Sequence, residues 1–305
     1  MTNEQRLRNL NPPTGPVDVI LDTDVSCEID DQFAIAYLLR NTEKLHIQGL
    51  CAAPFSFDGH PAPGAEQSYR TLREMLILAG RADLLDKTHR GSRTYLKDEH
   101  TPVESDAAAF MADTAMRYSP ERPVYVIAIG CGTNVASALL KNPAMRENAV
   151  VVWLCGHAHT WPDTNEFNME QDVAAARVIF DCGVPLVQVP CFGVVDRFTT
   201  TRYELEHWLK GKNTLCDYLT DNTIRAAESY AAGTAWSRPI WDVTAVAWLL
   251  NEEDAFMKGN LRPTPIPEYD HRYAFDQTRP LYRYIYHIRR DALYTDLFRK
   301  LANHA

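Results

Sequence analysis

The sequence predicts an α/β fold, a Rossmann-like and mainly parallel (mixed) sheet flanked by helices. Hydrophobic runs alternate with amphipathic stretches along most of the 305 residues. Strand–helix–strand alternation of this kind is typical of a parallel sheet with helices on both faces. Polar residues cluster directly after several of these runs, which is where ligands bind in such sheets. Because no repeat or linker divides the chain, we expect one domain over residues 1–305, with a mainly helical part from about residue 202.

Five hydrophobic runs, rich in Val, Ile and Leu, have the length and composition of buried strands. They lie at residues 17–22, 45–52, 124–129, 149–154 and 185–189. Elsewhere apolar residues recur at helical spacing. These stretches predict helices at residues 31–40, 65–79, 104–118, 134–141, 172–182, 204–209, 214–230, 242–250 and 291–302. Segment 54–64, which contains Gly, Pro, two Phe and one His, predicts an irregular loop that either covers a ligand or lies on the surface.

Composition excludes several classes of protein. A formal net charge of −9 and the lack of any basic run argue against a nucleic-acid binder. No apolar run approaches the roughly 20 residues that span a bilayer, and the polar segment 1–16 does not resemble a signal peptide. The seven cysteines are dispersed without a CxxC pair. We therefore expect reduced thiols and a cytoplasmic protein without a membrane or nucleic-acid partner.

Five carboxylates lie within ten residues at the end of the first predicted strand. Alternation along the strand places Asp22 and Asp24 on one side, whereas Asp30 and Asp31 fall at the start of the next helix. Two carboxylates about 4 Å apart repel by roughly 4 kcal/mol at an effective dielectric constant near 20. A helix dipole offsets only about 0.3–1 kcal/mol per charge. A bound cation is therefore the better explanation for this cluster.

The same residues also have an ordinary interpretation. Asp30 and Asp31 are common residue types at a helix start, and Asp22 or Asp24 could point into water. The Asp-x-Asp pair just upstream favours a metal site over this alternative. Carboxylate oxygens are hard ligands, which suit calcium or magnesium rather than zinc or copper.

Two further segments place polar groups after hydrophobic strands. The turn at residues 130–134, Gly-Cys-Gly-Thr-Asn, allows a tight passage from strand to helix and exposes backbone carbonyls; a plain capped turn explains it equally well. Glu166 and Asn168 stand two positions apart, so an extended backbone would point both the same way, toward vicinal sugar hydroxyls. A polar loop before a helix is the alternative.

Two histidines and a Trp-Asp pair complete the candidate residues. His157 and His159 lack a third histidine or a cysteine at a spacing typical of zinc sites, so we interpret them as loop histidines that face a substrate. Trp241 and Asp242 open an apolar helix. Alone, Asp242 would be a helix cap and Trp241 a core residue.

Together these pieces resemble the nucleoside hydrolase family, the calcium-dependent inosine-uridine preferring N-ribohydrolases. That family has Asp-x-Asp and Asp-Asp at the first strand end, a Gly-x-x-Thr-Asn turn, a Glu-Phe-Asn segment and a late Asp that opens an apolar helix. The matching positions are Asp22, Asp24, Asp30, Asp31, 130–134, 166–168 and Asp242. Order and spacing agree from about residue 17 to residue 250, and four motifs in register are a specific signal.

The resemblance implies a role for each residue of the metal site. Asp24 resembles the catalytic base that deprotonates the attacking water and also touches Ca²⁺. Asp31, Asp242 and the carbonyl of Thr133 resemble the remaining calcium ligands. Such an ion would orient water and sugar and lower the pKa of the water.

The resemblance also implies the substrate and its contacts. Asp30, Glu166 and Asn168 resemble the residues that hold the ribose hydroxyls, with Asp22 behind them. The substrate would be a ribonucleoside, cleaved at its N-glycosidic bond through an oxocarbenium-like transition state that nearby carboxylates stabilise. The family further implies a homodimer or homotetramer.

The chain departs from the family pattern at three places. Five residues rather than three separate Asp24 from Asp30, which brings Ser26, Cys27 and Glu28 near the site. Thr160 replaces an Asn that commonly contacts the sugar. Trp241 stands where pyrimidine-accepting members have a His that acts as an acid, and where purine-preferring members have Trp. We therefore expect Trp241 to stack on a purine or modified purine that leaves the sugar.

Two alternatives remain at this point. A hydrophobic strand followed by Asp-x-Asp also resembles a haloacid-dehalogenase-type phosphatase, in which Asp22 would be the nucleophile and Asp24 the acid. That family needs a later Lys and an acidic pair, which the sequence does not place well. A non-catalytic relative that binds a nucleoside or sugar is the second alternative.

Overall fold

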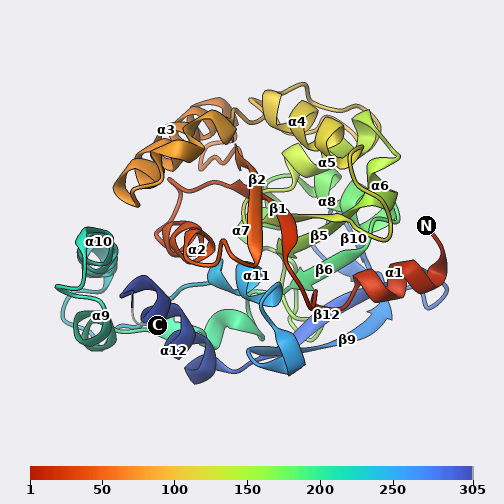
Figure 1. Ribbon diagram of the computed structural model, residues 1–305. Coiled ribbons are helices and arrows are strands. Elements are labelled where there is room, and N and C mark those ends of the chain that lie inside the picture. Colours follow the sequence, from red (N-terminus) through yellow and green to blue (C-terminus); the bar gives the residue numbers. More distant parts are fainter. Residues whose placement is uncertain (304–305) are drawn as a thin grey trace.

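The computed structural model describes residues 1–303 and contains an eight-stranded mixed sheet (Figure 1). The strand order is β3-β2-β1-β4-β5-β6-β12-β9, and all pairings are parallel except that of β12 with β9. The bounds of these strands are Val17–Thr23 (β1), Leu45–Ala52 (β2), Thr88–His89 (β3), Val124–Ala128 (β4), Ala149–Leu154 (β5), Leu186–Val189 (β6), Met257–Pro263 (β9) and Leu281–Ile288 (β12). The predicted fold class is confirmed.

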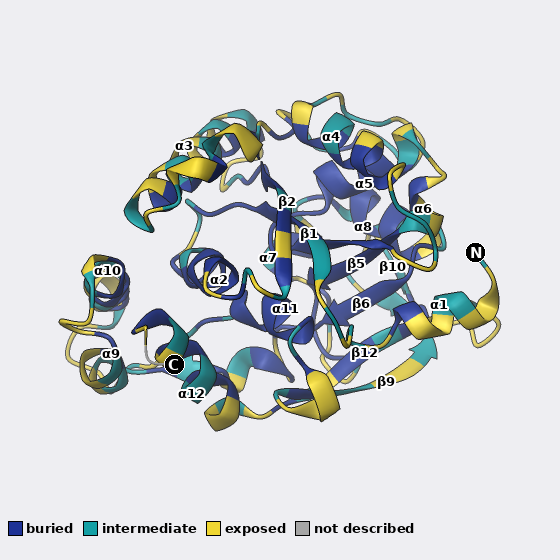
Figure 2. Cartoon of the chain, in the orientation of Figure 1, coloured by how far each residue is buried: buried dark blue, intermediate teal, exposed yellow. Residues whose placement is uncertain are grey.

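Helices cover both faces of this sheet (Figures 1 and 2). One face packs against α2 (Asp30–Leu39), α3 (Pro61–Leu78), α9 (Arg202–Trp208), α10 (Thr214–Ala231), α11 (Val243–Trp248) and α12 (Arg290–Leu301). The other face packs against α4 (Asp106–Ala115), α5 (Thr133–Lys141), α6 (Met145–Asn148), α7 (Phe167–Glu170) and α8 (Val173–Asp181). None of the helices between residues 1 and 303 has the length and apolar character needed to span a membrane.

The remaining elements are short. They are helix α1 (Asn3–Asn9), the 3₁₀ turns Ala82–Lys87, Val195–Arg197 and Glu252–Asp254, and the two-residue strands β7 (Thr199–Thr200), β8 (Arg238–Pro239), β10 (Ile266–Pro267) and β11 (Tyr273–Ala274). β7 pairs with β8, and β10 pairs with β11. All seven cysteines are free, so no disulfide supports the fold.

Strand β1 shows why the sheet has a core on each side. Val19 and Leu21 belong to one cluster of buried side chains, whereas Ile20 belongs to the other. Alternation along a strand directs successive side chains to opposite faces. The apolar side chains of β1 are therefore buried on both faces, as expected for a central strand of a parallel sheet.

The C-terminal part from residue 202 contains strands of the main sheet as well as helices. Its four α-helices, of which α10 and α12 are long, are accompanied by β9 and β12, which extend the main sheet beyond β6. Strand β9 was not predicted from the sequence, because most of its residues are not buried and it contains Gly259, so it lacks the apolar run of a buried strand. In β12 the aromatic residues Tyr282, Tyr284 and Tyr286 alternate with other types, and this period-two pattern was a usable signal.

Candidate active site

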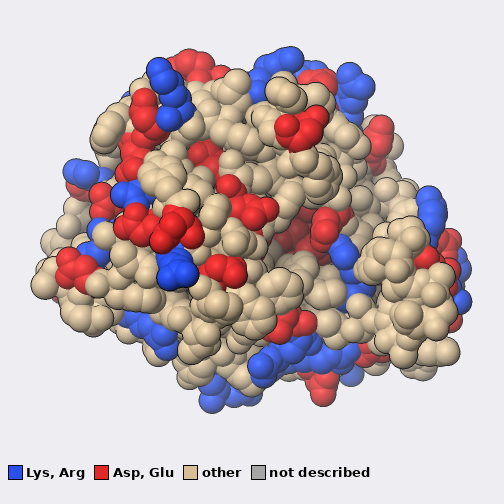
Figure 3. Space-filling model, turned by 180° about the vertical axis from the view of Figure 1, so that it is seen from behind, with Lys and Arg blue, Asp and Glu red and all other residues tan. Residues whose placement is uncertain are grey.

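A cavity of about 290 Å³ opens where the parallel strands end. Asp24 follows β1, Ile129 follows β4, Leu154 ends β5 and Cys191 follows β6, and all four line the cavity. Acidic side chains gather in and beside a hollow near the middle of the face shown in Figure 3. Six carboxylates line the cavity, namely Asp24, Glu28, Asp30, Asp31, Glu166 and Asp242. The strand ends predicted from the sequence thus meet in one place.

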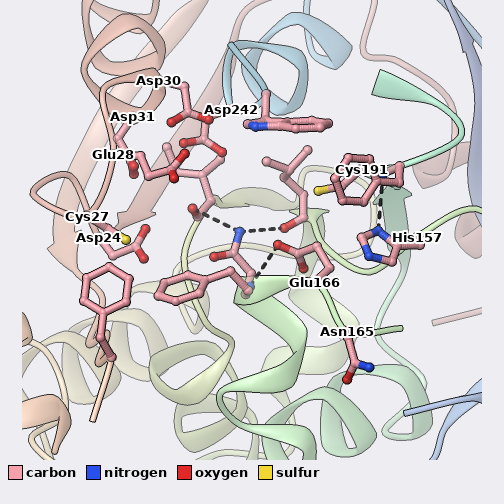
Figure 4. A pocket seen from close by; sticks show the side chains of 17 residues that line it. Asp24, Cys27, Glu28, Asp30, Asp31, His157, Asn165, Glu166, Cys191 and Asp242 are labelled. Atoms are coloured by element: carbon pink, nitrogen blue, oxygen red, sulfur yellow. Dashed lines mark hydrogen bonds between the residues drawn. The ribbon is translucent and has the colours of Figure 1, made fainter. Parts of the chain in front are cut away.

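Three carboxylates converge at one side of this cavity (Figure 4). Asp30 and Asp31 begin α2, Asp242 stands at the N-cap position of α11, and these two helices pack against each other. One oxygen from each residue lies within 4.8 Å of the others, and all three side chains are buried. The two helices begin near residues 30 and 242, which are far apart in the sequence. The packing of α2 against α11 therefore creates this cluster.

The electrostatics of the three carboxylates favour a cation among them. Burial raises the pKa of Asp30 and of Asp242, with further increases from neighbouring carboxylates, and it raises the pKa of Asp31 to about 7. The Thr23 hydroxyl donates a hydrogen bond to Asp31. Oδ1 of Asp30 is buried without a hydrogen-bond partner. Uncompensated buried carboxylates are costly, and an all-oxygen donor set fits a hard divalent ion.

Asp24 and Asp22 have different surroundings, although both lie at the end of β1. Asp24 is buried and lines the cavity, and burial followed by the charge of Asp31 raises its pKa. Asp22 does not line the cavity. Its Oδ1 accepts a hydrogen bond of 2.9 Å from Asn134 Nδ2, and burial raises its pKa to about 7. Asp22 therefore supports the strand end from behind, and a phosphatase with Asp22 as nucleophile does not fit this geometry.

Glu166 and Asn168 lie at the cavity wall and are fixed by backbone groups. Glu166 caps α7, and its carboxylate accepts hydrogen bonds from the amides of Gly156, Asn168 and Met169 at 2.8–3.1 Å. Burial nevertheless raises its pKa to about 7. Asn168 Nδ2 donates to the carbonyls of Ile129 and Leu154. Both side chains are thus held rigidly toward the cavity.

Thr133 does not lie where the resemblance implied a calcium ligand. It is absent from the cavity lining, and its hydroxyl donates a 2.5 Å hydrogen bond to Asp172. As the first residue of α5, Thr133 directs its carbonyl along the helix axis, into the first turn. Ile129, four positions earlier, is the residue of this turn that lines the cavity. Ile129, and not Thr133, is therefore the residue of this turn that is a candidate to offer a backbone oxygen to a metal.

The two histidines that the sequence singled out, His157 and His159, lie in different surroundings. His157 lines the cavity and lies across it from the carboxylate cluster (Figure 4). Its Nδ1 accepts a hydrogen bond from the Phe192 amide at 3.2 Å, which assigns the ring proton to Nε2. Burial lowers the pKa of His157, so the ring is neutral near pH 7. Its ring also packs near Trp161.

His159, in contrast, points away from the cavity. Its Nε2 lies 2.8 Å from the Tyr282 hydroxyl and its Nδ1 lies 3.1 Å from Arg262. Burial and then the charge of Arg262 lower the pKa of His159 to about 4. The prediction that His159 faces a substrate is not supported by this geometry, because the ring ties its loop to β12 and β9. Thr160 is exposed and does not line the cavity either.

Aromatic rings form two walls near the cavity. On one wall, Trp241 contacts Phe192 edge to face, with ring centroids 5.5 Å apart. On the other wall, the ring centroids of Phe57 and Phe167 lie 5.3 Å apart. All four rings line the cavity. Phe57 belongs to the irregular loop that was expected to cover a ligand or lie on the surface. Phe192 was missed, although its position shortly after a parallel strand was the available signal.

Comparison with known proteins decides the family. A sequence model described as "Inosine-uridine preferring nucleoside hydrolase" matches residues 19–278. The chain belongs to this family. The curated relatives include the pyrimidine-specific ribonucleoside hydrolase RihA of Citrobacter koseri, which is 26% identical over 73% of this chain and 77% of the relative. RihA of Salmonella arizonae is 25% identical over 77% of this chain and 80% of the relative.

Solved structures share the fold of this nucleoside hydrolase. The purine-preferring ribonucleoside hydrolase from Gardnerella vaginalis has a TM-score of 0.76 at 18% identity, covering 94% of this chain and 98% of its own. The plant nucleoside hydrolase PpNRh1 has a TM-score of 0.74 at 20% identity, with coverage of 94% and 99%. The family makes this protein a hydrolase of N-glycosyl compounds, which excludes the phosphatase alternative. The relatives include both pyrimidine-specific and purine-preferring enzymes, so they leave the base undecided.

Proposed function

We propose that this nucleoside hydrolase cleaves the N-glycosidic bond of ribonucleosides to ribose and a free base, with purine or modified purine bases favoured. The observation that carries the proposal is the convergence of Asp24, Asp30, Asp31 and Asp242 in one buried cavity bordered by aromatic rings. Its charged end suits the polar pentose, and its aromatic walls suit a planar base. The homo-oligomeric state and the cytoplasmic location stay predictions.

The metal of this site is proposed to be Ca²⁺. Asp24, Asp31 and Asp242 would supply carboxylate oxygens, and the carbonyl of Ile129 would take the place first assigned to Thr133. When bound there, a divalent ion supplies a hold on water and sugar hydroxyls and lowers the pKa of that water. The unpartnered oxygen of Asp30 supports a contact with the ribose diol at the same side.

Each side chain of the cavity is proposed to have its own role in the reaction. Asp24 takes a proton from the water that attacks the anomeric carbon, as its oxygens border the cavity and it lies next to the carboxylate cluster. Glu166 and Asn168 hold the sugar from the opposite wall. The carboxylates stabilise the positive charge that develops on the pentose ring as the bond to the base breaks. The base leaves with the bonding electrons and takes up a proton.

Two residues are proposed to contact the base. Trp241 borders the cavity beside Asp242, in a position to stack on a planar ring. His157 carries its proton on Nε2 and can donate a hydrogen bond to a polar atom of the substrate without being charged. A neutral imidazole of lowered pKa can polarise a reacting group in this manner.

The test is a panel of purine, pyrimidine and modified ribosides assayed for free reducing sugar with and without a chelator. We expect release of ribose from purine ribosides, loss of activity with chelator, and recovery when calcium is added back. Ligand binding without any turnover would overturn the proposal in favour of a non-catalytic binding protein. Turnover that is insensitive to chelation would overturn the metal assignment alone.

A further inference from the structure

An ion pair joins the two segments that carry the carboxylate cluster. Glu28 lies in the long loop between Asp24 and Asp30, and its carboxylate accepts a hydrogen bond from the Arg238 guanidinium. Arg238 belongs to β8, four positions before Asp242. The pair therefore connects the loop that follows β1 to the segment that leads into α11.

The surroundings of Arg238 make Glu28 its main partner. The Arg238 side chain is 15% exposed, whereas that of Glu28 is 49% exposed and borders the cavity. Arg238 also reaches the Tyr230 hydroxyl at 3.5 Å, at the end of α10. No lysine or arginine lines the cavity among residues 1–303. Arg238 is consequently the cation that the chain itself brings to the rim of this acidic site.

The charges on the two segments would otherwise separate them. Asp30 and Asp31 on one segment face Asp242 on the other, with oxygens within 4.8 Å. Like charges at this distance repel when the carboxylates are ionised, and without a cation nothing between them offsets that repulsion. A cross-link between the same two segments opposes it. The two ends of the link, Glu28 and Arg238, are close in sequence to the residues that repel.

We propose that Glu28 and Arg238 form a clamp that holds the two halves of the metal site together before the metal binds. Both are positioning residues, because they act on the metal through the segments that carry Asp30, Asp31 and Asp242. This inference rests on the metal site proposed above. The clamp uses the additional length of the loop in this chain, since Glu28 lies within the five residues that separate Asp24 from Asp30.

Substitution of Arg238 distinguishes the clamp from simple electrostatics. Removing a positive charge near a cation site should strengthen calcium binding if only long-range charge matters. The clamp predicts the opposite, because the two segments lose their link. We expect Arg238→Gln to weaken calcium binding about tenfold in isothermal titration calorimetry, and Arg238→Lys to retain most of the affinity.

A double-mutant cycle tests the pairing itself. Glu28→Gln and the double variant Glu28→Gln/Arg238→Gln should each bind calcium about as weakly as Arg238→Gln, since every one of them lacks the same link. Arg202→Gln is the matched control, because Arg202 pairs with Glu228 between α9 and α10 without touching the cavity. That control should bind calcium as the unaltered protein does, and thermal unfolding should confirm that all variants are folded.

Tighter or unchanged calcium binding by a folded Arg238→Gln would overturn the clamp, as would additive losses in the double variant. These outcomes differ from a failure of the proposed function. If the unaltered protein binds no calcium, both the proposed metal site and the clamp are overturned. If it binds calcium and shows the expected cycle but cleaves no riboside, only the proposed reaction is overturned.

Discussion

Asp31 at the start of α2 and Asp242 at the N-cap of α11 place carboxylate oxygens within 4.8 Å of each other. The two residues lie in helices that pack together, so the helix interface sets their separation. Replacing an aspartate of this pair by asparagine removes one negative charge and keeps the shape of the side chain, so the variant tests the contribution of that charge.

Asp31→Asn should reduce calcium affinity and kcat/KM by more than about a hundredfold, because even groups that only orient metal ligands typically cost 10–100-fold. Calorimetry and the reducing-sugar assay would measure the two losses. Asp22→Asn is a useful comparison, since Asp22 does not line the cavity. Full calcium affinity in Asp31→Asn would contradict a ligand role.

Asp24→Asn should lower kcat by roughly 10²–10⁴-fold, the usual contribution of a general base. At saturating calcium, ribose or a product-like inhibitor should still bind, because Glu166 and Asn168 remain in place on the other wall. The measurement is the ratio of the effect on kcat to the effect on inhibitor affinity. A variant with kcat within tenfold of the unaltered enzyme would exclude Asp24 as the base.

Trp241→Ala should lower kcat/KM on purine ribosides by about 5–150-fold, because base–aromatic stacking typically contributes about 1–3 kcal/mol. The half-buried ring contributes to packing as well, so thermal unfolding must be followed in parallel. Trp236→Ala removes a tryptophan outside this cavity and serves as the control. Equal activity of Trp241→Ala and the unaltered enzyme would reject the stacking role.

His157→Phe keeps a flat ring beside Phe192 and Trp161 and removes both ring nitrogens. Loss of one hydrogen bond to the substrate should reduce kcat/KM about five- to thirteenfold, since such a bond contributes about 1–1.5 kcal/mol. Steady-state kinetics on the preferred riboside measures this, with thermal unfolding as the check on folding. Unchanged kinetics would leave His157 a packing residue.

His159 should make stability depend on acid pH. Its pKa is lowered to about 4 in the folded protein, compared with about 6.5 in an unfolded chain. Because the unfolded state takes up the proton first, the contribution of His159 to stability should decline as pH falls from about 6.5 to about 4. The decline should reach at most about 3 kcal/mol, at 1.36 kcal/mol per pKa unit.

Denaturant unfolding of the unaltered protein and of His159→Gln between pH 4 and pH 7 would measure this. The stability advantage of the unaltered protein should shrink toward pH 4. The exposed His100 provides the control variant His100→Gln, which should show no such trend. A constant difference across the pH range would contradict the assignment.

The sequence by itself indicated five strands of the parallel sheet, namely β1, β2, β4, β5 and β6, and the acidic residues of the candidate site. Strands β2 and β5 were predicted to the residue. In β5 every position is apolar and buried, as a strand covered on both faces requires. The acidic run after β1 and Asp242 before α11 stood out for a similar reason. Carboxylates next to buried elements are costly unless a function retains them.

Only the tertiary structure decided which of these groups meet. Packing of α2 against α11 brings Asp30 next to Asp242, and the start of α5 turns the Thr133 carbonyl away while Ile129 remains at the cavity. His159 and Arg238 were beyond local reasoning, since their partners come from β12 and from the loop after β1. Local periodicity encodes the faces of an element, whereas the direction of a carbonyl or the partner of a charge depends on segments that only the folded chain brings together.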